Sequence, residues 1–515
     1  MTPTLLRAAR RPALVALLAL SVATPRAAAQ DMSVVPVEDV VAAHLGFLAS
    51  DALGGRETGT LQGDITAQYV AAAFRAAGLE PAGDPGSFLH AYDLETSQLD
   101  RHGTALVLSG AAGDHGFVLG EDFAVRVGGS TAHGEGGVVF AGYGLVDADQ
   151  GLDDYAGLDV EGKVVLALMG APEGKREPRS SGARRSWARE RGAVALLMLM
   201  ERDDRRSQSW FAYMQHDMER LSMRLPSDPE PGFAYAMLQP DAADRIAAAG
   251  QLDLDAARVA ARAGESVGRT LDGVGLRLHV PVAVDRLVAH NVAGLLPGRD
   301  PELAHEVIVL SAHMDHVGIN ADGQVNNGAD DNASGTTALM TAAALLARNP
   351  APRRSVLFLA VSAEEKGLLG SESWVATPSL DLARVVANVN IDMVGRNDPE
   401  VLGATPSAEH DEYNTLVPLA VALAPQAGLR IEWETGEGRL RRRVDEYYHR
   451  SDHANFSKAG IPVVFFFSGE HEDYHRPSDT LDKLDQGKVA NVSRFVARLL
   501  TVVGDADERP QRLAP

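Results

Sequence analysis

The stretch RSVLFLAVSAEEKGLLGS, residues 354–371, places an uninterrupted apolar run directly before two adjacent carboxylates, Glu364 and Glu365. The run predicts a buried strand, and the segment from about 367 to 377 predicts a helix. Three more apolar runs follow the same pattern and alternate with helical segments; they are 306–313 (EVIVLSAH), 385–393 (VVANVNIDM) and 461–469 (IPVVFFFSG). Apolar strands that alternate with helices predict an α/β fold, a three-layer α/β/α domain with a mixed, mainly parallel sheet.

The length of 515 residues predicts more than one domain, because single hydrophobic cores stop growing at roughly 250–300 residues. Short β-type segments separated by Gly and Asp turns, with one helix near 186–200, predict a β-rich inserted domain. Within this domain, the polar, Met-rich segment 204–232 predicts an irregular surface excursion. The expected order of segments is a leader at 1–29, an N-terminal part of the larger domain at 30–104, the inserted domain at 105–280, the main part of the larger domain at 281–504, and a loose tail at 505–515.

The first 29 residues predict a secretory signal peptide. Arg7, Arg10 and Arg11 precede the apolar stretch 13–23, and three alanines follow just before Gln30. The apolar stretch is too short to span a bilayer, which takes about 20 residues. We therefore expect the mature protein to be exported to the periplasm or the extracellular space.

Charge and cysteine content narrow the possible partners. The formal net charge of −22 argues against nucleic acid as a partner, and removal of the leader, with four arginines and no acid, makes the chain more acidic still. The chain has no cysteine, which excludes disulfides, thiolate metal sites and acylated cysteine anchors. No other apolar run approaches membrane length, so we expect no stable membrane anchor. The oligomeric state stays open.

Side chains that can bind a metal follow nearly every predicted strand. They are His313 and Asp315, Glu364 and Glu365, Asp392 and, after a short loop, His475; Asp330 and Asp331 begin a predicted helix. A lone His or Asp at a strand end is usually a cap or a loop residue. Five such positions at the carboxyl edge of one sheet predict a metal site. Oxygen and imidazole donors suit Zn²⁺, Co²⁺ or Mn²⁺, and two ions about 3.5–4 Å apart require a bridging carboxylate.

The ordered motifs of the chain resemble those of the di-zinc exopeptidases that include bacterial leucyl aminopeptidases and glutamate carboxypeptidases, the clan MH peptidases. The motifs are HMD at 313–315, GADDNASG at 328–335, SAEEKGLLGS at 362–371, NIDMVG at 390–395 and YHRPSDT at 474–480. The segments 48–60 and 141–166 resemble the N-terminal segment and the inserted protease-associated domain of many members. The resemblance implies a zinc-exopeptidase (phosphorylase/hydrolase-like) fold, two Zn²⁺ ions per chain and a peptide substrate.

The resemblance also implies which residues bind the ions. His313 and Asp392 would hold one Zn²⁺, and Glu365 and His475 would hold the other. Asp331, four residues before the last glycine of GADDNASG, would bridge the two ions. The neighbouring Asp330 then remains an acid of the loop.

Three further residues receive catalytic roles from the resemblance. Glu364 would act as general base toward a water that bridges the metals, and Asp315 would orient the His313 imidazole and sit at an unusual cis peptide. Tyr474 would donate a hydrogen bond to the oxyanion or serve as a packing residue; the sequence leaves both open. These roles imply a peptidase, and the acidic surroundings of the metals together with the predicted export favour an exported aminopeptidase that hydrolyses N-terminal residues of peptides.

Other functions remain open at this stage. A carboxypeptidase or dipeptidase of the same family would need a cation for the substrate carboxylate, and Arg439 and Arg441 to Arg443 are candidates. A glutaminyl cyclase-like acyl transferase would use one zinc ion. A receptor-like binding protein on the same fold would be inert, although here every ligand position and Glu364 carry a competent residue.

Overall fold

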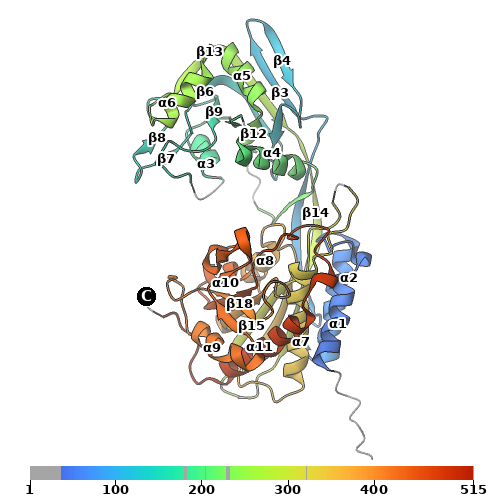
Figure 1. The fold of residues 1–515 in the computed structure, drawn as a ribbon. Helices are drawn as coiled ribbons and strands as arrows, with labels where there is room; N and C mark the ends of the chain where they lie inside the picture. Colours follow the sequence, from blue (N-terminus) through green and yellow to red (C-terminus); the bar gives the residue numbers. More distant parts are fainter. Residues whose placement is uncertain (1–35, 179–181, 203, 228–231, 321, 514–515) are drawn as a thin grey trace, which may run out of the picture.

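The computed structural model describes residues 36–178, 182–202, 204–227, 232–320 and 322–513. The chain forms two lobes, each built around its own sheet (Figure 1). A ten-stranded sheet lies in the larger lobe and an eight-stranded sheet in the smaller one. The predicted signal peptide, 1–29, lies outside the described residues.

Four parallel strands form the centre of the larger sheet. Their spatial order is β16 (Ser355–Val361), β15 (Val307–His313), β17 (Val385–Ile391) and β22 (Val463–Phe467). All residues of these strands are buried. Within β15, Val307 and Val309 belong to one hydrophobic core, and Ile308 and Leu310 belong to another. The apolar runs are continuous because both faces of the sheet are covered.

Further strands make the sheet mixed, as expected. On one side lie β14 (Val282–Leu296), β2 (Leu89–Leu99) and β11 (Ser222–Arg224), all antiparallel to their neighbours, and the short β1 (Glu80–Pro81) also pairs with β14. On the other side, β18 (Val401–Thr405) runs antiparallel to β22, and β19 (Arg430–Glu432) runs parallel to β18.

Helices cover both faces of this sheet. One face carries α1 (Val37–Leu48), α2 (Leu61–Ala77), α7 (Gly335–Ala347), α9 (Leu416–Leu423) and α11 (Gln486–Asp505). The other carries α8 (Leu369–Ala376) and α10 (His453–Lys458), whose Trp374 and Phe456 rings lie 5.6 Å apart. The structure therefore has the three predicted layers. Among the described residues, no helix combines the length and apolar character needed to cross a bilayer.

The smaller lobe is built from the residues between β2 and β14. Its strands lie in the order β4 (Gly113–Phe117), β3 (Ala105–Gly110), β13 (Arg269–Val280), β6 (Ala132–Phe140), β9 (Val164–Leu168), β10 (Ala195–Leu199), β12 (Ala234–Leu238) and β5 (Phe123–Val125). Its helices are α3 (Ala183–Glu190), α4 (Arg205–Asp217), α5 (Pro240–Ala249) and α6 (Leu254–Arg262), and β7 (Val146–Asp147) pairs with β8 (Leu152–Asp153). The long strands β2 and β14 pair from Leu89 to Leu99 and lead into the lobe (Figure 1).

Three sequence-based expectations differ from the structure. The segment 204–232 is not irregular, because it contains α4 and β11. Phe211 and Met214 of α4 are buried, as is Met218 directly after the helix, and β11 joins the larger sheet. The helix near 186–200 ends at Glu190, and the apolar residues after it form the buried strand β10. The tail is not loose in its described part, since Arg509 pairs with Glu306 at 2.7 Å and Leu513 N donates to Tyr413 O.

The pair between Glu306 and Arg354 provides a test of the larger core. The Arg354 side chain is 1% exposed, and its Nε lies 2.6 Å from Glu306 Oε2. Glu306→Gln leaves a buried guanidinium without its counter-charge, so we expect the free energy of unfolding to fall by about 3 kcal/mol in urea titrations. Glu400→Gln is the matched control, because Glu400 is 72% exposed and pairs with Arg430 at the surface. Its loss should stay below about 1 kcal/mol, and equal losses in the two variants would contradict this account.

Candidate metal centre

The carboxyl ends of the parallel strands bring the predicted metal-binding residues to one edge of the sheet. His313 is the last residue of β15, Asp392 follows β17 directly, and Glu364 and Glu365 come shortly after β16. Neighbouring parallel strands end at the same edge, so side chains far apart in the sequence meet there. The structure brings all five sequence-predicted ligands together.

Asp331 reaches this edge from a distorted turn before α7. The π-helical turn Ala329–Ser334 has non-helical dihedral angles at Asp331, and the Asp331–Asn332 peptide bond is cis. The unusual cis peptide is therefore at Asp331, and the expectation that it lies at Asp315 was wrong. Gly328 before the turn has φ 55°, and a Cβ there would lie 2.1 Å from the Asp331 carbonyl oxygen. Only a glycine allows this close approach.

The side chains form two groups that share Asp331. In the first, His313 Nε2 lies 3.1 Å from Asp392 Oδ1 and 3.4 Å from Asp331 Oδ1. In the second, His475 Nε2 lies 3.1 Å from Asp331 Oδ2 and 3.0 Å from Glu365 Oε2. The two oxygens of the Asp331 carboxylate thus face one group each.

The donor atoms fit zinc in type and in spacing. All are imidazole nitrogens or carboxylate oxygens, and within each group they lie within 4.8 Å of one another. Ligands about 2.0–2.1 Å from a tetrahedral Zn²⁺ are about 3.3 Å apart, close to the 3.0–3.4 Å contacts observed here. Each group also holds two buried carboxylates whose oxygens lie within 4.8 Å of each other and repel, and a cation in each group would relieve that repulsion.

His316 is a member of the second group that sequence reasoning missed. Its Nδ1 lies 2.7 Å from Glu365 Oε1 and 3.7 Å from Asp331 Oδ2, and the side chain is fully buried. The motif HMDH contains a second histidine three residues after His313, but the family resemblance assigns no role to that position. The signal was present in the sequence, and only the fold shows where the ring points.

A buried arginine holds the loops of the centre in place. Arg56 is 1% exposed and donates to four backbone carbonyls within 3.0 Å, those of Leu48, Met314, Asn327 and Gly328. Burial lowers the pKa of Arg56 to about 10, and the nearby Asp331 and Asp315 oppose this shift. The guanidinium therefore stays charged at neutral pH beneath the acidic edge, a role that sequence reasoning also missed.

Glu364 and Glu365 have opposite pKa shifts. Burial, together with the charges of Glu365 and Asp392, raises the pKa of Glu364 well above its usual range, although His313 acts against it. Burial and Asp331 would also raise the pKa of Glu365, but His475 and His316 hold it at about 2. Carboxylates whose surroundings separate their pKa values in this way are suited to different tasks, one to exchange a proton and one to stay ionised.

Asp315 and Tyr474 lie next to the two groups. The Asp315 carbonyl oxygen is 3.2 Å from His313 Nδ1, whereas its carboxylate Oδ1 is 3.8 Å away. The carboxylate instead accepts from the Thr58 hydroxyl and the Glu364 backbone N–H, each at 3.2 Å. The Tyr474 ring stacks on the His475 ring with centroids 3.9 Å apart. Burial raises the pKa of the Tyr474 hydroxyl well above its usual value, and nearby carboxylates add to this shift. The hydroxyl therefore stays protonated and can donate a hydrogen bond.

A cavity with an apolar wall opens beside the metal-binding groups. Its lining includes Asp331, Glu364, Asp392 and Tyr474, together with the apolar and aromatic side chains of Met393, Tyr447, Phe465 and Phe467. Arg450 is the arginine in this lining, and it pairs with Glu470, which also lines the cavity, at 2.9 Å. The arrangement offers an acidic end next to the two groups and an apolar pocket beyond it.

Residues 291–500 match the model of peptidase family M28. This segment contains all the residues of the two groups of candidate ligands and is similar to the M28 peptidases. A protein of Arthroderma benhamiae named "Probable leucine aminopeptidase" is 27% identical over 216 residues, which cover 40% of this chain and 55% of that protein. The chain spans about half the length of the curated relatives it matches, or less.

Two solved structures are similar over nearly the whole chain. The aminopeptidase from Aneurinibacillus sp. strain AM-1 aligns with a TM-score of 0.60 at 21% identity, covering 93% of this chain and 95% of that one. A zinc aminopeptidase from Bacillus subtilis aligns with a TM-score of 0.51 at 18% identity, covering 91% and 95%. At these identities the likeness establishes the fold, the α/β zinc-exopeptidase fold that the sequence predicts.

Neighbouring aspartates allow a sharp test of the shared carboxylate. Asp331→Asn removes the charge that the two groups share, so zinc-loaded protein should hold less than about half the zinc of the wild type by elemental analysis. Asp330→Asn is the matched control, because Asp330 belongs to neither group and its Oδ1 accepts from Gly395 N–H, which an amide oxygen can also do. Equal metal content in the two variants would contradict the assignment of Asp331.

Proposed function

We propose that this protein is a di-zinc aminopeptidase that removes N-terminal residues from peptides. The observation that carries the proposal is the Asp331 carboxylate, which faces two groups of nitrogen and oxygen donors beside a cavity. His313 and Asp392 would complete one ion site, and Glu365, His475 and His316 the other. Zinc ions held there would lower the pKa of a bound water and polarise the peptide carbonyl; Co²⁺ or Mn²⁺ are possible substitutes.

Glu364 is the proposed general base. It lines the cavity, its Oε2 lies 4.0 Å from His313 Nε2, and burial raises its pKa above the usual range of a glutamate, which makes it a better proton acceptor than an exposed one. It would accept a proton from the attacking water and pass it to the leaving amine. Asp315 would keep the His313 ring in place through its carbonyl, and Tyr474 would donate its hydroxyl proton in a hydrogen bond to the developing oxyanion.

The charge of the cavity favours a substrate amine over a substrate carboxylate. Its lining contains the acids Asp331, Glu364, Asp392 and Glu470, and its arginine, Arg450, is paired with one of them. Arg439 and Arg441 to Arg443 are absent from that lining; Arg441 pairs with Glu434 and Arg443 with Glu409. Carboxypeptidase activity is the second candidate, and Arg450 is the observation that favours it.

The apolar wall indicates the preferred side chain. Met393, Phe465 and Phe467 line the cavity and would surround the first side chain of a peptide. A pocket of this kind favours Leu, Met or Phe over charged residues, because burial of an unpaired charge is costly. We also propose that residues 1–29 direct export and that the smaller lobe is a protease-associated domain.

A substrate panel tests the function. Leucyl and phenylalanyl peptides with a free N-terminus should be cleaved, N-acetylated copies should not, and amidation of the C-terminus should leave the rate nearly unchanged. A chelator should abolish the activity and added Zn²⁺ should restore it. Release of C-terminal residues from the N-acetylated peptides would show that the protein is a carboxypeptidase and would refute the proposal. If zinc-loaded protein cleaved none of these peptides, the peptidase proposal would be refuted in favour of a binding protein.

The adjacent glutamates separate catalysis from metal binding. Glu364→Gln should lower kcat by about 10²–10⁴-fold with metal content unchanged, because the amide cannot accept the proton. Glu365→Gln should lower metal content as well as kcat, because it removes a charged ligand. The two variants are matched in chemistry and position, and elemental analysis with peptide assays distinguishes them. Wild-type kcat in Glu364→Gln would refute its role as base.

A further inference from the structure

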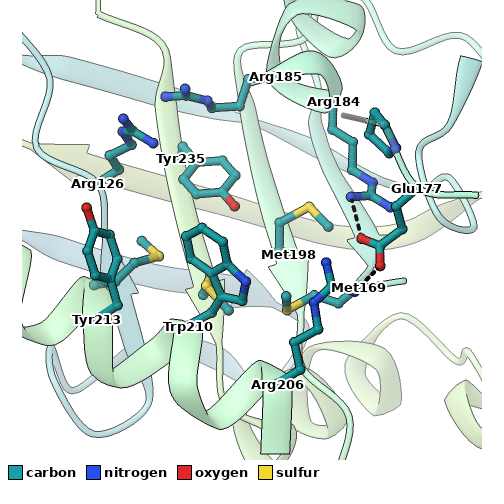
Figure 2. Close-up of a pocket in the computed structure, with 13 residues that line it drawn as sticks. Arg126, Met169, Glu177, Arg184, Arg185, Met198, Arg206, Trp210, Tyr213 and Tyr235 are labelled. Carbon is teal, nitrogen blue, oxygen red and sulfur yellow. Dashed lines mark hydrogen bonds and ion pairs between the residues drawn. The ribbon is translucent and has the colours of Figure 1, made fainter. Parts of the chain in front are cut away.

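A second cavity lies in the smaller lobe, where α4 and the first turn of α3 face the sheet of β9, β10, β12 and β5 (Figure 2). Its volume is about 180 Å³. The lining combines four arginines and one carboxylate with aromatic and sulfur-containing side chains; these are Arg126, Arg184, Arg185, Arg206, Glu177, Trp210, Tyr213, Tyr235, Met169, Met198, Met214 and Met237, beside Pro178. Nothing in the proposed peptidase chemistry uses this cavity.

Two of the arginines are engaged with Glu177. Arg184 Nη1 lies 3.5 Å from its carboxylate, and Arg206 forms an ion pair with it (Figure 2). Arg184 is also fixed by backbone carbonyls, since its Nε donates to Tyr143 O at 2.8 Å. The side of the cavity around Glu177 is therefore held in place by these contacts, and its charges are partly balanced.

The other two arginines have no counter-charge among the described residues. Within the part of the chain that the structure describes, Arg126 and Arg185 form no ion pair with a carboxylate. The Arg185 guanidinium lies over the Tyr235 ring, 5.4 Å from its centroid. Burial, and next the charge of Arg126, lower the pKa of Arg185, which agrees with two cations side by side. Figure 2 shows both head groups at the same side of the cavity.

The remaining wall is aromatic and partly open to solvent. Trp210 and Tyr213 project from α4 with side chains in edge-to-face contact, their ring centroids 5.7 Å apart. They are 39% and 57% exposed, high fractions for large apolar side chains beside a cavity. Methionines form the floor, and their flexible side chains adapt to ligands of different shape. Exposed aromatic residues next to unpaired arginines mark a surface that gains stability when a ligand covers it.

We propose that this cavity binds a small organic carboxylate that carries an aromatic or branched apolar group. The planar guanidiniums of Arg126 and Arg185 would bind the carboxylate through paired hydrogen bonds, and Trp210, Tyr213 and the methionines would cover the apolar group. The volume is below the 300–1,000 Å³ range typical of drug-sized ligands, which indicates a molecule of the size of one blocked amino acid. The proposal is independent of the peptidase function.

N-acetyl-L-phenylalanine is a suitable probe, because it has the carboxylate and the ring but no free amine for an aminopeptidase. Isothermal titration calorimetry with the full chain should show saturable binding that persists in a chelator, which separates this cavity from the metal centre. N-acetyl-L-phenylalaninamide, which lacks the charge, and inorganic phosphate, which lacks the ring, should each bind at least about tenfold more weakly. Equal binding of the amide or of phosphate would overturn the proposal, as would no saturable binding of the probe.

Variants then assign the binding to named residues. Arg185→Met and Arg126→Met keep the aliphatic bulk and remove the charge, so each should raise the dissociation constant by about tenfold or more. Arg277→Met, at an exposed arginine of β13 outside the cavity, should leave it unchanged. Without ligand, Arg185→Met should not lower the unfolding temperature, because it relieves repulsion from Arg126. Trp210→Ala, at a partly exposed position, should also weaken binding. Unchanged affinity in all three cavity variants would overturn the proposal.

Discussion

The concentration of buried carboxylates at one edge of the larger sheet is the constraint on which the rest of the site depends. Four largely buried carboxylates face one another near the ends of the parallel strands; they are Asp331, Glu364, Glu365 and Asp392. Buried like charges are tolerated only with cations close by. The guanidinium of Arg56 supplies part of that charge, and divalent cations held by the shared carboxylate and the imidazoles of His313, His316 and His475 would supply the rest.

The backbone around this edge is held in conformations that few residues adopt. Ala363, Met393 and His475 have φ values of 53°, 52° and 56°, and each lies at or next to a proposed ligand or base. Left-handed φ angles in residues other than glycine cost free energy and persist only where the surroundings enforce them. Here Arg56 ties four loop carbonyls together, and the packed layers on both faces fix the strand ends. The rigidity of the fold thus holds the donors at the spacing that a metal ion needs.

The two lobes differ in the charge of their cavities. The cavity beside the metal-binding groups is lined mainly by acids, and its arginine is paired with a glutamate. Among the described residues, the lining of the smaller lobe's cavity includes four arginines and one carboxylate. Two long strands, β2 and β14, run from one lobe toward the other and are continuous in the larger sheet. The chain as a whole is strongly acidic, so its overall charge does not explain a pocket rich in arginine. The arginines of this pocket are therefore a specific local feature.

Local patterns in the sequence predicted the parallel centre, the covering helices and a set of candidate metal-binding side chains at the strand ends, because each depends on short-range order; the family resemblance selected the five proposed ligands from that set. An apolar run such as 354–361 has to be buried on both faces, and a polar residue at its end has to lie at the sheet edge. Three features needed tertiary structure: the direction of the His316 ring, the carbonyls that Arg56 binds, and the place of Arg450 in the cavity. The helix α4 was hidden by its polar composition. The contacts of His316 with Glu365 and of Arg56 with Met314 join residues that lie 49 and 258 positions apart, and a local pattern carries no information about such contacts.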